Sequence, residues 1–296
     1  MSTITANQLS EGITLYLPHS FATTLKERLE ISPGTMPATG SDIYGQRKYM
    51  EGAYKPLNSW RTPEDFEVRL LTESSTLKSI YESLTIFRIP DPLIEIFESI
   101  AFNKVSDYAG YRLVFEEKQQ ELSDAMMAVA GLFAGLIVEG NPLSSSKLLC
   151  FSYEPANIET IAYDNRSNEY FGLHLDDSDG SPLLCRQEAR NRISLNIGAE
   201  PRYLLFLNLT IETMIDMISA EIQPRSVIEK MNTQQMVGTF FRLFPRYPVL
   251  RLRQDPYDAY IAPTDNIVHD GCTLNRSTPD MTMVFTGFFK TYDDDY

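Results

Sequence analysis

Hydrophobic and polar positions follow different patterns in the two halves of the chain. From residue 148 onward, short runs rich in β-branched and aromatic residues are separated by turn residues, a pattern typical of a β-sandwich or barrel. Nine such runs favour a jelly roll over a parallel α/β sheet. The expected strands cover residues 148–153, 159–163, 171–175, 192–197, 203–209, 249–253, 260–263, 267–269 and 281–289.

The first half has helical spacing instead, after a turn-rich start. Helices are expected at residues 62–84, 92–102 and 119–138. The last one contains an uncharged apolar run at 125–138, which is shorter than the roughly 20 residues that cross a bilayer and is therefore expected to be a buried helix. Residues 211–244 also have helical spacing and interrupt the β half as an insertion. We therefore expect one domain over 1–296: a helical and loop-rich flank at 1–147 and a β core at 148–289.

The charge balance narrows the classes of partner. The chain has 26 basic and 40 acidic residues, a formal charge of −14, whereas nucleic-acid binders show a basic surface. Anionic membrane surfaces are disfavoured for the same reason. Small molecules or proteins are the expected partners, and the oligomeric state stays open. The three cysteines form no C-x-x-C pair and the N-terminus lacks an apolar signal segment, so a cytoplasmic location is expected.

The chemistry centres on the histidines, of which the chain has only three. His174 and Asp176 lie two residues apart on an expected strand, so they share one face. Together with His269 they could form the facial arrangement of two imidazoles and one carboxylate that holds iron in non-haem Fe(II) oxygenases. The alternative is that His174 is an ordinary strand residue and His269 a turn residue. His19 is expected in an exposed loop.

On these residues the sequence resembles the Fe(II)/2-oxoglutarate-dependent oxygenase superfamily. The resemblance rests on His174-Leu175-Asp176, the distal His269 and the β-rich order over residues 148–289. It implies a double-stranded β-helix (a cupin-like jelly roll) with Fe(II) bound by His174, Asp176 and His269. It also implies O2 and 2-oxoglutarate as cosubstrates, with succinate and CO2 released. The substrate would be a small molecule of secondary or amino-acid-derived metabolism that is hydroxylated, desaturated or cyclised.

The family also implies a basic residue that binds 2-oxoglutarate, and two arginines are candidates. Arg276 follows His269 at a shorter distance than is usual in the family, and its guanidinium could bind a carboxylate through two hydrogen bonds. Arg192 is the second candidate. Strand alternation puts it on one face with Ser194 and Asn196, and this face could equally line the barrel or meet solvent.

Two rival functions stay open. One is a non-haem iron oxidase on the same fold that does not use 2-oxoglutarate, which the irregular position of Arg276 allows. The other is a β-barrel that binds a ligand or a protein without catalysis.

A local cluster of arginines comprises Arg186, Arg190, Arg192 and Arg202. These side chains could bind a carboxylate or simply pair with neighbouring acids at the surface.

Overall fold

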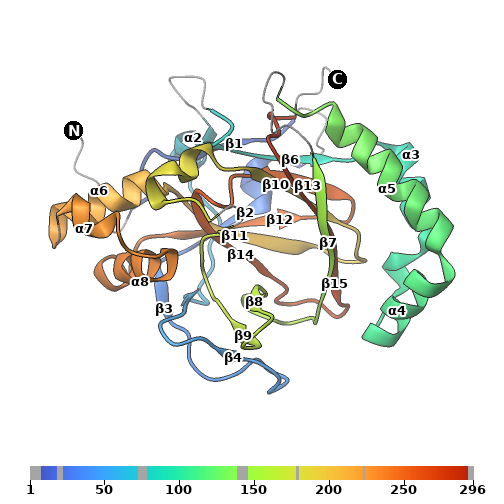
Figure 1. The fold of residues 1–296 in the computed structure, drawn as a ribbon, viewed down its shortest axis with the longest axis horizontal. Helices are drawn as coiled ribbons and strands as arrows, with labels where there is room; N and C mark the ends of the chain where they lie inside the picture. Colours follow the sequence, from blue (N-terminus) through green and yellow to red (C-terminus); the bar gives the residue numbers. More distant parts are fainter. Residues whose placement is uncertain are drawn as a thin grey trace.

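The computed structural model describes residues 8–18, 23–72, 79–138, 146–177, 180–222 and 224–292. His19 and the acidic residues 293–295, which the sequence predicts to be a solvated tail, lie outside these ranges. The helices are α1 (Leu25–Arg28), α2 (Asp65–Thr72), α3 (Asp91–Ile100), α4 (Tyr108–Glu117), α5 (Gln119–Ala134), α6 (Ile211–Glu221), α7 (Arg225–Ile228) and α8 (Thr233–Leu243). Figure 1 shows α3, α4 and α5 on one side of the sheets and α6, α7 and α8 on the other.

Two sheets form the middle of the molecule. The six-stranded sheet has the order β1 (Thr14–Tyr16), β6 (Ser83–Arg88), β13 (Asp258–Ala262), β10 (Asn191–Asn196), β15 (Asp280–Gly287) and β7 (Lys147–Glu154). The four-stranded sheet has the order β14 (Ile267–Cys272), β11 (Arg202–Thr210), β12 (Val249–Gln254) and β2 (Leu29–Ser32). All neighbours in the two sheets are antiparallel except β1 and β6. Smaller pairs join β3 (Thr35–Pro37) to β5 (Tyr54–Pro56), and β4 (Lys48–Tyr49) to β9 (Glu169–Tyr170) and β8 (Tyr163–Asp164).

The chain passes back and forth between the two sheets. After β7 in the larger sheet it bridges to the smaller one at His174, returns to β10, and then forms β11 and β12 in the smaller sheet. It continues through β13 in the larger sheet and β14 in the smaller one, and ends with β15 in the larger sheet. This alternation confirms the predicted double-stranded β-helix.

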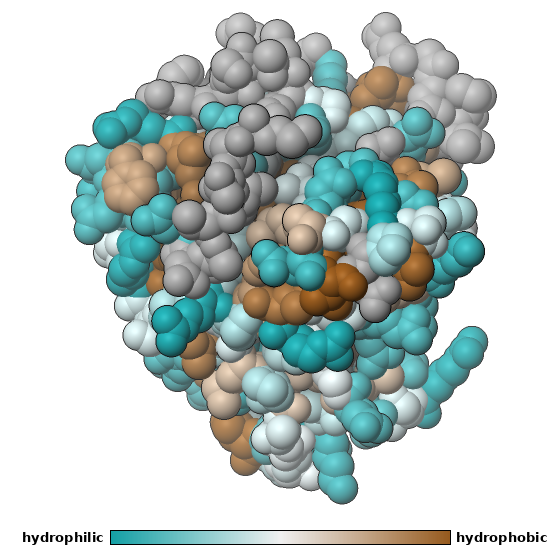
Figure 2. All heavy atoms as spheres, turned by 90° about the vertical axis from the view of Figure 1, so that its left-hand side faces the viewer, coloured by the Kyte–Doolittle hydropathy of each residue, from teal (hydrophilic) through white to brown (hydrophobic). Residues whose placement is uncertain are grey.

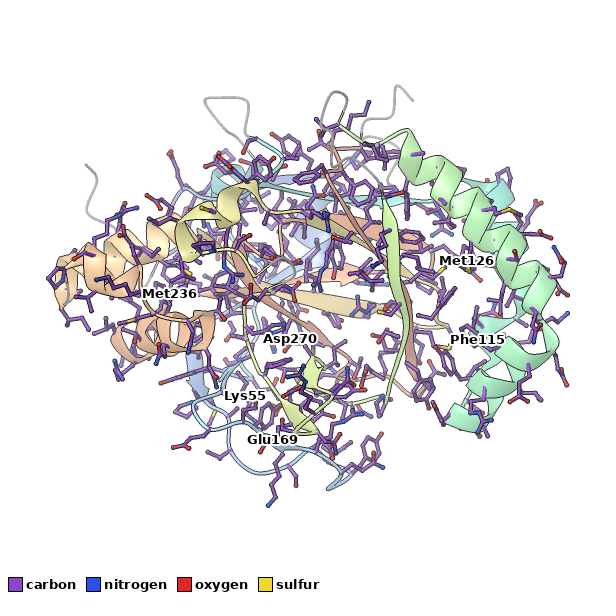
Figure 3. The ribbon with its side chains drawn as sticks, in the orientation of Figure 1. Lys55, Phe115, Met126, Glu169, Met236 and Asp270 are labelled. Carbon is purple, nitrogen blue, oxygen red and sulfur yellow. The ribbon has the colours of Figure 1, made fainter. Side chains whose placement is uncertain are left out.

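Strands of the core are buried on both faces, which explains their continuous apolar runs. On β10, Ile193 and Leu195 pack outward in a cluster with residues of α3 and α5, such as Phe97 and Phe133. On β11, Leu205 and Leu207 pack against α6 and α8, whereas Leu204 and Phe206 point between the sheets. Figure 3 shows Phe115 and Met126 on the α4–α5 side and Met236 on the opposite side. The helices therefore cover the outer faces of the sheets and leave the interior of the barrel for a site.

The N-terminal flank is less helical than the sequence predicts. The expected helix at 62–84 is limited to α2 in the described residues, and β6 begins at Ser83. Within β6, Leu84 and Ile86 pack between the sheets, while Phe87 packs towards α5. This short apolar run is buried on both faces and has no strict alternation, so its pattern does not distinguish strand from helix. Together β1, β2 and β6 extend both sheets, and the flank is built into the core.

Other elements are closer to the predictions. The helices expected at 92–102 and 119–138 are observed as α3 and α5, and the insertion expected at 211–244 as α6, α7 and α8. Residues 171–175 were expected as a strand, but only His174 forms a β-bridge there.

Figure 2, which views the insertion side, shows hydrophobic residues in small groups among hydrophilic ones. Within the described ranges, no helix combines the length and the apolar character needed to cross a bilayer.

Candidate metal centre

The two histidines of the sequence motif face each other across a β-bridge. The backbone N–H of His174 donates to the carbonyl of His269 at 3.0 Å, and the N–H of His269 donates back at 2.8 Å. Residues directly opposite in such a pair share one face, and the two imidazole centroids lie 4.8 Å apart. Asp176 lies on the same segment as His174, with its N–H bonded to the carbonyl of Thr264 at 3.1 Å. One potential ligand atom from each of the three side chains lies within 4.8 Å of the others.

Both imidazoles present the same nitrogen to this cluster. Nδ1 of His174 lies 2.9 Å from the carbonyl oxygen of Gly172, and Nδ1 of His269 lies 3.2 Å from that of Ile267. A carbonyl only accepts, so each Nδ1 is assigned as the protonated donor and each Nε2 points into the cluster. The two Nε2 atoms lie 3.7 Å (His174) and 3.4 Å (His269) from carboxylate oxygens of Asp176.

Burial and neighbouring charges set the protonation of the cluster. Burial lowers the pKa of His269 to about 4, so this imidazole is neutral at pH 7. Burial also opposes ionisation of Asp176, but His269 and Arg192 outweigh it and hold the pKa of the carboxyl below its usual value. Burial would lower the pKa of His174, yet the carboxylates of Asp176 and Asp270 raise it to about 10. A metal at this cluster would therefore displace a proton from His174.

The cluster opens into a cavity of about 510 Å³ between the two sheets. Its wall combines the three cluster residues with charged and hydroxyl-bearing side chains from both sheets. These include Glu154, Arg192, Ser194, Arg202, Tyr260 and Thr282. The cavity is large enough for a small ligand and is polar at the end where the cluster lies.

Arg192 and Asn196 occupy different places although they share a strand face. Arg192 lines the cavity, and its Nη1 forms an ion pair with Oδ2 of Asp176 at 2.7 Å. Asn196 is fully buried, and its side chain bonds to the backbone of Glu200, Gln254 and Gly198. The polar face of β10 therefore turns towards the barrel interior, but Asn196 shapes the β10–β11 turn and is not part of the cavity wall.

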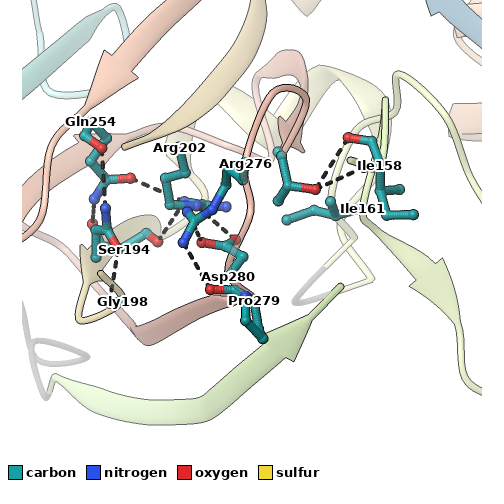
Figure 4. A network of polar contacts seen from close by, with 12 residues as sticks. Ile158, Ile161, Ser194, Gly198, Arg202, Gln254, Arg276, Pro279 and Asp280 are labelled. Carbon is teal, nitrogen blue, oxygen red and sulfur yellow. Dashed lines mark hydrogen bonds and ion pairs between the residues drawn. The ribbon is translucent and has the colours of Figure 1, made fainter. Parts of the chain in front are cut away.

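Arg276 does not belong to the described residues that line this cavity. Its Nη1 donates to Oδ1 of Asp280 at 3.0 Å, and its Nη2 donates to the carbonyl of Pro279 at 2.8 Å. The side chain is only 3% exposed. The turn after β14 folds the guanidinium back onto its own chain (Figure 4), which is why the expected carboxylate anchor is not positioned to reach a ligand beside His269.

Arg202 was expected only as one member of the arginine cluster, with no individual role. It lies at the start of β11, is 4% exposed and lines the cavity. Its Nε donates to Oδ2 of Asp280 at 2.9 Å and its Nη1 to Oε1 of Gln254 at 3.0 Å, as Figure 4 shows. A Cβ on Gly271 would lie 2.7 Å from Nη2 of Arg202. Because Gly271 follows His269 by two positions on β14, the guanidinium passes over the strand that carries this histidine. That glycine is the one sequence signal of a close approach.

Two further charged groups hold the segments that carry the cluster. Asp270 is fully buried near the centre of the molecule (Figure 3), and its Oδ1 accepts hydrogen bonds from the backbone of Ile161 and Ala162 at 3.0 Å. Its Oδ2 lies 3.7 Å from Nδ1 of His174. Arg186 is 2% exposed, donates to the carbonyl of Asp176, and forms an ion pair with Asp177 at 2.6 Å. Asp270 therefore ties the 161–162 backbone beside His174, and Arg186 fixes the backbone of Asp176.

Comparison with known proteins gave similarity only to solved structures. No family model matches the chain, and no curated protein matches it. Similar structures include the Kdo hydroxylase KdoO, described as a non-heme Fe(II) alphaketoglutarate dependent dioxygenase, in complex with alphaketoglutarate and Fe(III), in complex with cobalt(II), and without ligands. In each case the TM-score is 0.38 and the identity 15%, over 69% of this chain and 79% of that chain.

Proposed function

We propose that this protein is a non-haem Fe(II)- and 2-oxoglutarate-dependent oxygenase that oxidises a small-molecule substrate, with His174, Asp176 and His269 as the iron ligands. The observation that carries the proposal is the convergence of these three side chains within 4.8 Å at the wall of an internal cavity. A set of two imidazoles and one carboxylate suits Fe(II) and leaves coordination positions for a cosubstrate and O2.

The arrangement of the three side chains fits a metal that displaces the second proton of His174. Each Nε2 points into the cluster because each Nδ1 is bonded to a backbone carbonyl. Asp176 stays ionised at neutral pH beside Arg192, whose ion pair fixes one carboxylate oxygen. The two histidine segments are tied together, since His174 and His269 exchange two backbone hydrogen bonds. Such preorganisation lowers the cost of metal binding.

For 2-oxoglutarate, we propose Arg202 as the residue that binds the carboxylate distant from the metal. Its guanidinium is held by Asp280 and Gln254 and lies over Gly271, close to the proposed iron ligand His269. A guanidinium can hold a carboxylate with two parallel hydrogen bonds. Arg192 is the second candidate, although its contact with Asp176 favours a role beside the metal.

When bound, iron and 2-oxoglutarate supply the oxidising power for attack on a C–H bond, using O2 and releasing succinate and CO2. The chain's own residues would hold the reactants and exclude water. The apolar cluster between the sheets adjoins the cavity at Tyr260, which belongs to both. Hydroxylation, desaturation and ring closure are all compatible with this arrangement, and the substrate decides between them.

The proposal is tested by adding Fe(II) and then 2-oxoglutarate to the metal-free protein without oxygen. We expect a weak visible charge-transfer band that needs both additions and is absent in His174→Ala and His269→Ala. Asp176→Asn, which removes the proposed carboxylate ligand, should lose the band as well. Asp91→Asn makes the same change at the exposed start of α3 and is the matched control that should keep the band. Tight Fe(II) binding without a band would favour an iron oxidase that does not use 2-oxoglutarate. Equal, weak Fe(II) binding in all variants would favour a non-catalytic binding protein.

A further inference from the structure

A second cavity adjoins the one that holds the proposed iron ligands. It has a volume of about 540 Å³ and shares two wall residues, Tyr153 and Tyr163, with the first cavity. Its other walls come from the loop before β4, the start of α4, the residues that follow β7 and the turn before β15. A molecule that occupied both cavities would pass these two tyrosines on its way to the proposed metal.

Four tyrosines dominate this second cavity: Tyr44, Tyr108, Tyr153 and Tyr163. Tyr108 is 58% exposed and Tyr44 is 48% exposed, large values for aromatic rings at a cavity wall. The Tyr108 ring packs against Tyr153 at a centroid distance of 5.3 Å, and the Tyr44 hydroxyl donates to the carbonyl of Ala156 at 3.0 Å. The rings are therefore held in place by the protein while part of their surface stays open to a ligand.

The charges of the cavity wall disfavour an anionic ligand. Among the described wall residues the one cation is Arg47, whose guanidinium lies 3.6 Å above the ring of Tyr163. Arg47 is already bonded to Glu154 at 3.3 Å and to Asn168 at 2.9 Å. With Asp107 on the same wall as Arg47, the described wall residues carry no net positive charge that would attract a phosphate or carboxylate, and the chain as a whole carries −14.

The remaining wall groups also disfavour a wholly apolar ligand. Gln46, Ser106, Asp107 and the tyrosine hydroxyls supply hydrogen-bond donors and acceptors next to the aromatic faces. This combination suits an uncharged ring that presents C–H groups on its faces and hydroxyls on its edge. Sugar rings have this character, since their C–H faces stack on tyrosine and their hydroxyls both donate and accept hydrogen bonds.

We propose that this tyrosine-lined cavity binds an uncharged hydroxylated ring, a sugar or glycoside, and that this ring is the part of the substrate remote from the reacting carbon. The assignment of the ring to a substrate rests on the proposed function. Binding of the ring itself needs neither iron nor 2-oxoglutarate.

The test measures binding of methyl glycosides to the metal-free protein by saturation-transfer NMR. The panel contains methyl glucoside, galactoside, mannoside and N-acetylglucosaminide, with an N-acetylated amino-acid amide and cyclohexanol as non-sugar probes. We expect saturable binding of at least one glycoside and weakening by about tenfold in Tyr108→Ala. Tyr108→Phe, which keeps the ring, should retain most of the binding. Phe66→Ala, on α2 and also 58% exposed, is the matched control and should bind like the parent protein.

Three results would overturn the proposal: no glycoside binds, glycoside binding is unchanged in Tyr108→Ala, or the non-sugar probes bind as well as the sugars. Because the experiment omits iron, glycoside binding can succeed when the iron titration fails. The reverse outcome, a charge-transfer band without glycoside binding, would leave the proposed oxygenase intact and reject the sugar site.

Discussion

Arg202 and Arg276 form a matched pair for testing which arginine binds 2-oxoglutarate. Both are almost fully buried and both donate to the same carboxylate, Asp280, at 2.9 Å and 3.0 Å. Only Arg202 lines the cavity that holds the proposed iron ligands. Replacing either one by methionine removes a buried partner of Asp280, but only one replacement removes a group that faces the proposed cosubstrate.

The two variants should therefore differ in binding and resemble each other in stability. Loss of one partner of a buried ion pair costs about 3–5 kcal/mol, and the lower end applies here because Asp280 keeps its second arginine. Loss of a buried charged contact to a ligand costs about 2–5 kcal/mol, which corresponds to roughly 30-fold or more in affinity. We expect Arg202→Met to weaken 2-oxoglutarate binding by at least this factor and Arg276→Met to change it little.

The first assay titrates the iron-loaded protein with 2-oxoglutarate without oxygen and uses the visible charge-transfer band to measure binding. The second assay measures the stability of each variant by urea unfolding. Arg202→Lys, which keeps the charge but loses the planar two-point geometry, should fall between the parent protein and Arg202→Met. Equal weakening by both methionine variants, or weakening by Arg276→Met alone, would refute the assignment of Arg202.

Three further expectations concern positioning, pH and packing. Arg186→Ala should weaken Fe(II) binding by about 10–100-fold through the backbone of Asp176, with partial rescue in Arg186→Lys; isothermal titration with Fe(II) measures both. Burial raises the pKa of Glu200, but four hydrogen bonds from residues 277–278 outweigh it and lower the pKa to about 2. The ionised Glu200 carboxylate therefore stabilises the fold above pH 4.5, and this stabilisation is lost as the pH falls towards 2. The difference in urea unfolding midpoint between the parent protein and Glu200→Gln should vanish over the same pH interval. Phe133→Ala, which removes a fully buried side chain of α5, should cost about 3–5 kcal/mol in urea unfolding without changing Fe(II) affinity.

The β core could be predicted because its strands are short apolar runs between clear turns. The runs at 192–197 and 203–209 correspond to β10 and β11, whose two faces are both buried. The same property made β6 ambiguous, since a run that is buried on both faces lacks the alternation that marks a strand. The helix α4 escaped prediction because it has no fully buried residue and hence only a weak apolar stripe.

The histidine cluster was predictable, but the different positions of Arg202 and Arg276 were not, for a physical reason. His174 and Asp176 share a face through their spacing, and His269 pairs with His174 as the strand order requires. Which arginine reaches the cavity depends on the register that sets Tyr203 opposite Cys272 on β14, and on a turn that bends Arg276 back to Pro279. Neither the register nor the turn geometry is encoded in residue spacing alone.

The central claim is that iron is held by His174, Asp176 and His269. Crystals grown with Fe(II) without oxygen, measured on both sides of the iron absorption edge, test this claim directly. We expect one strong anomalous peak between the Nε2 atoms of the two histidines and the carboxylate of Asp176. A peak at other residues, or none at full iron loading of the solution, would contradict it.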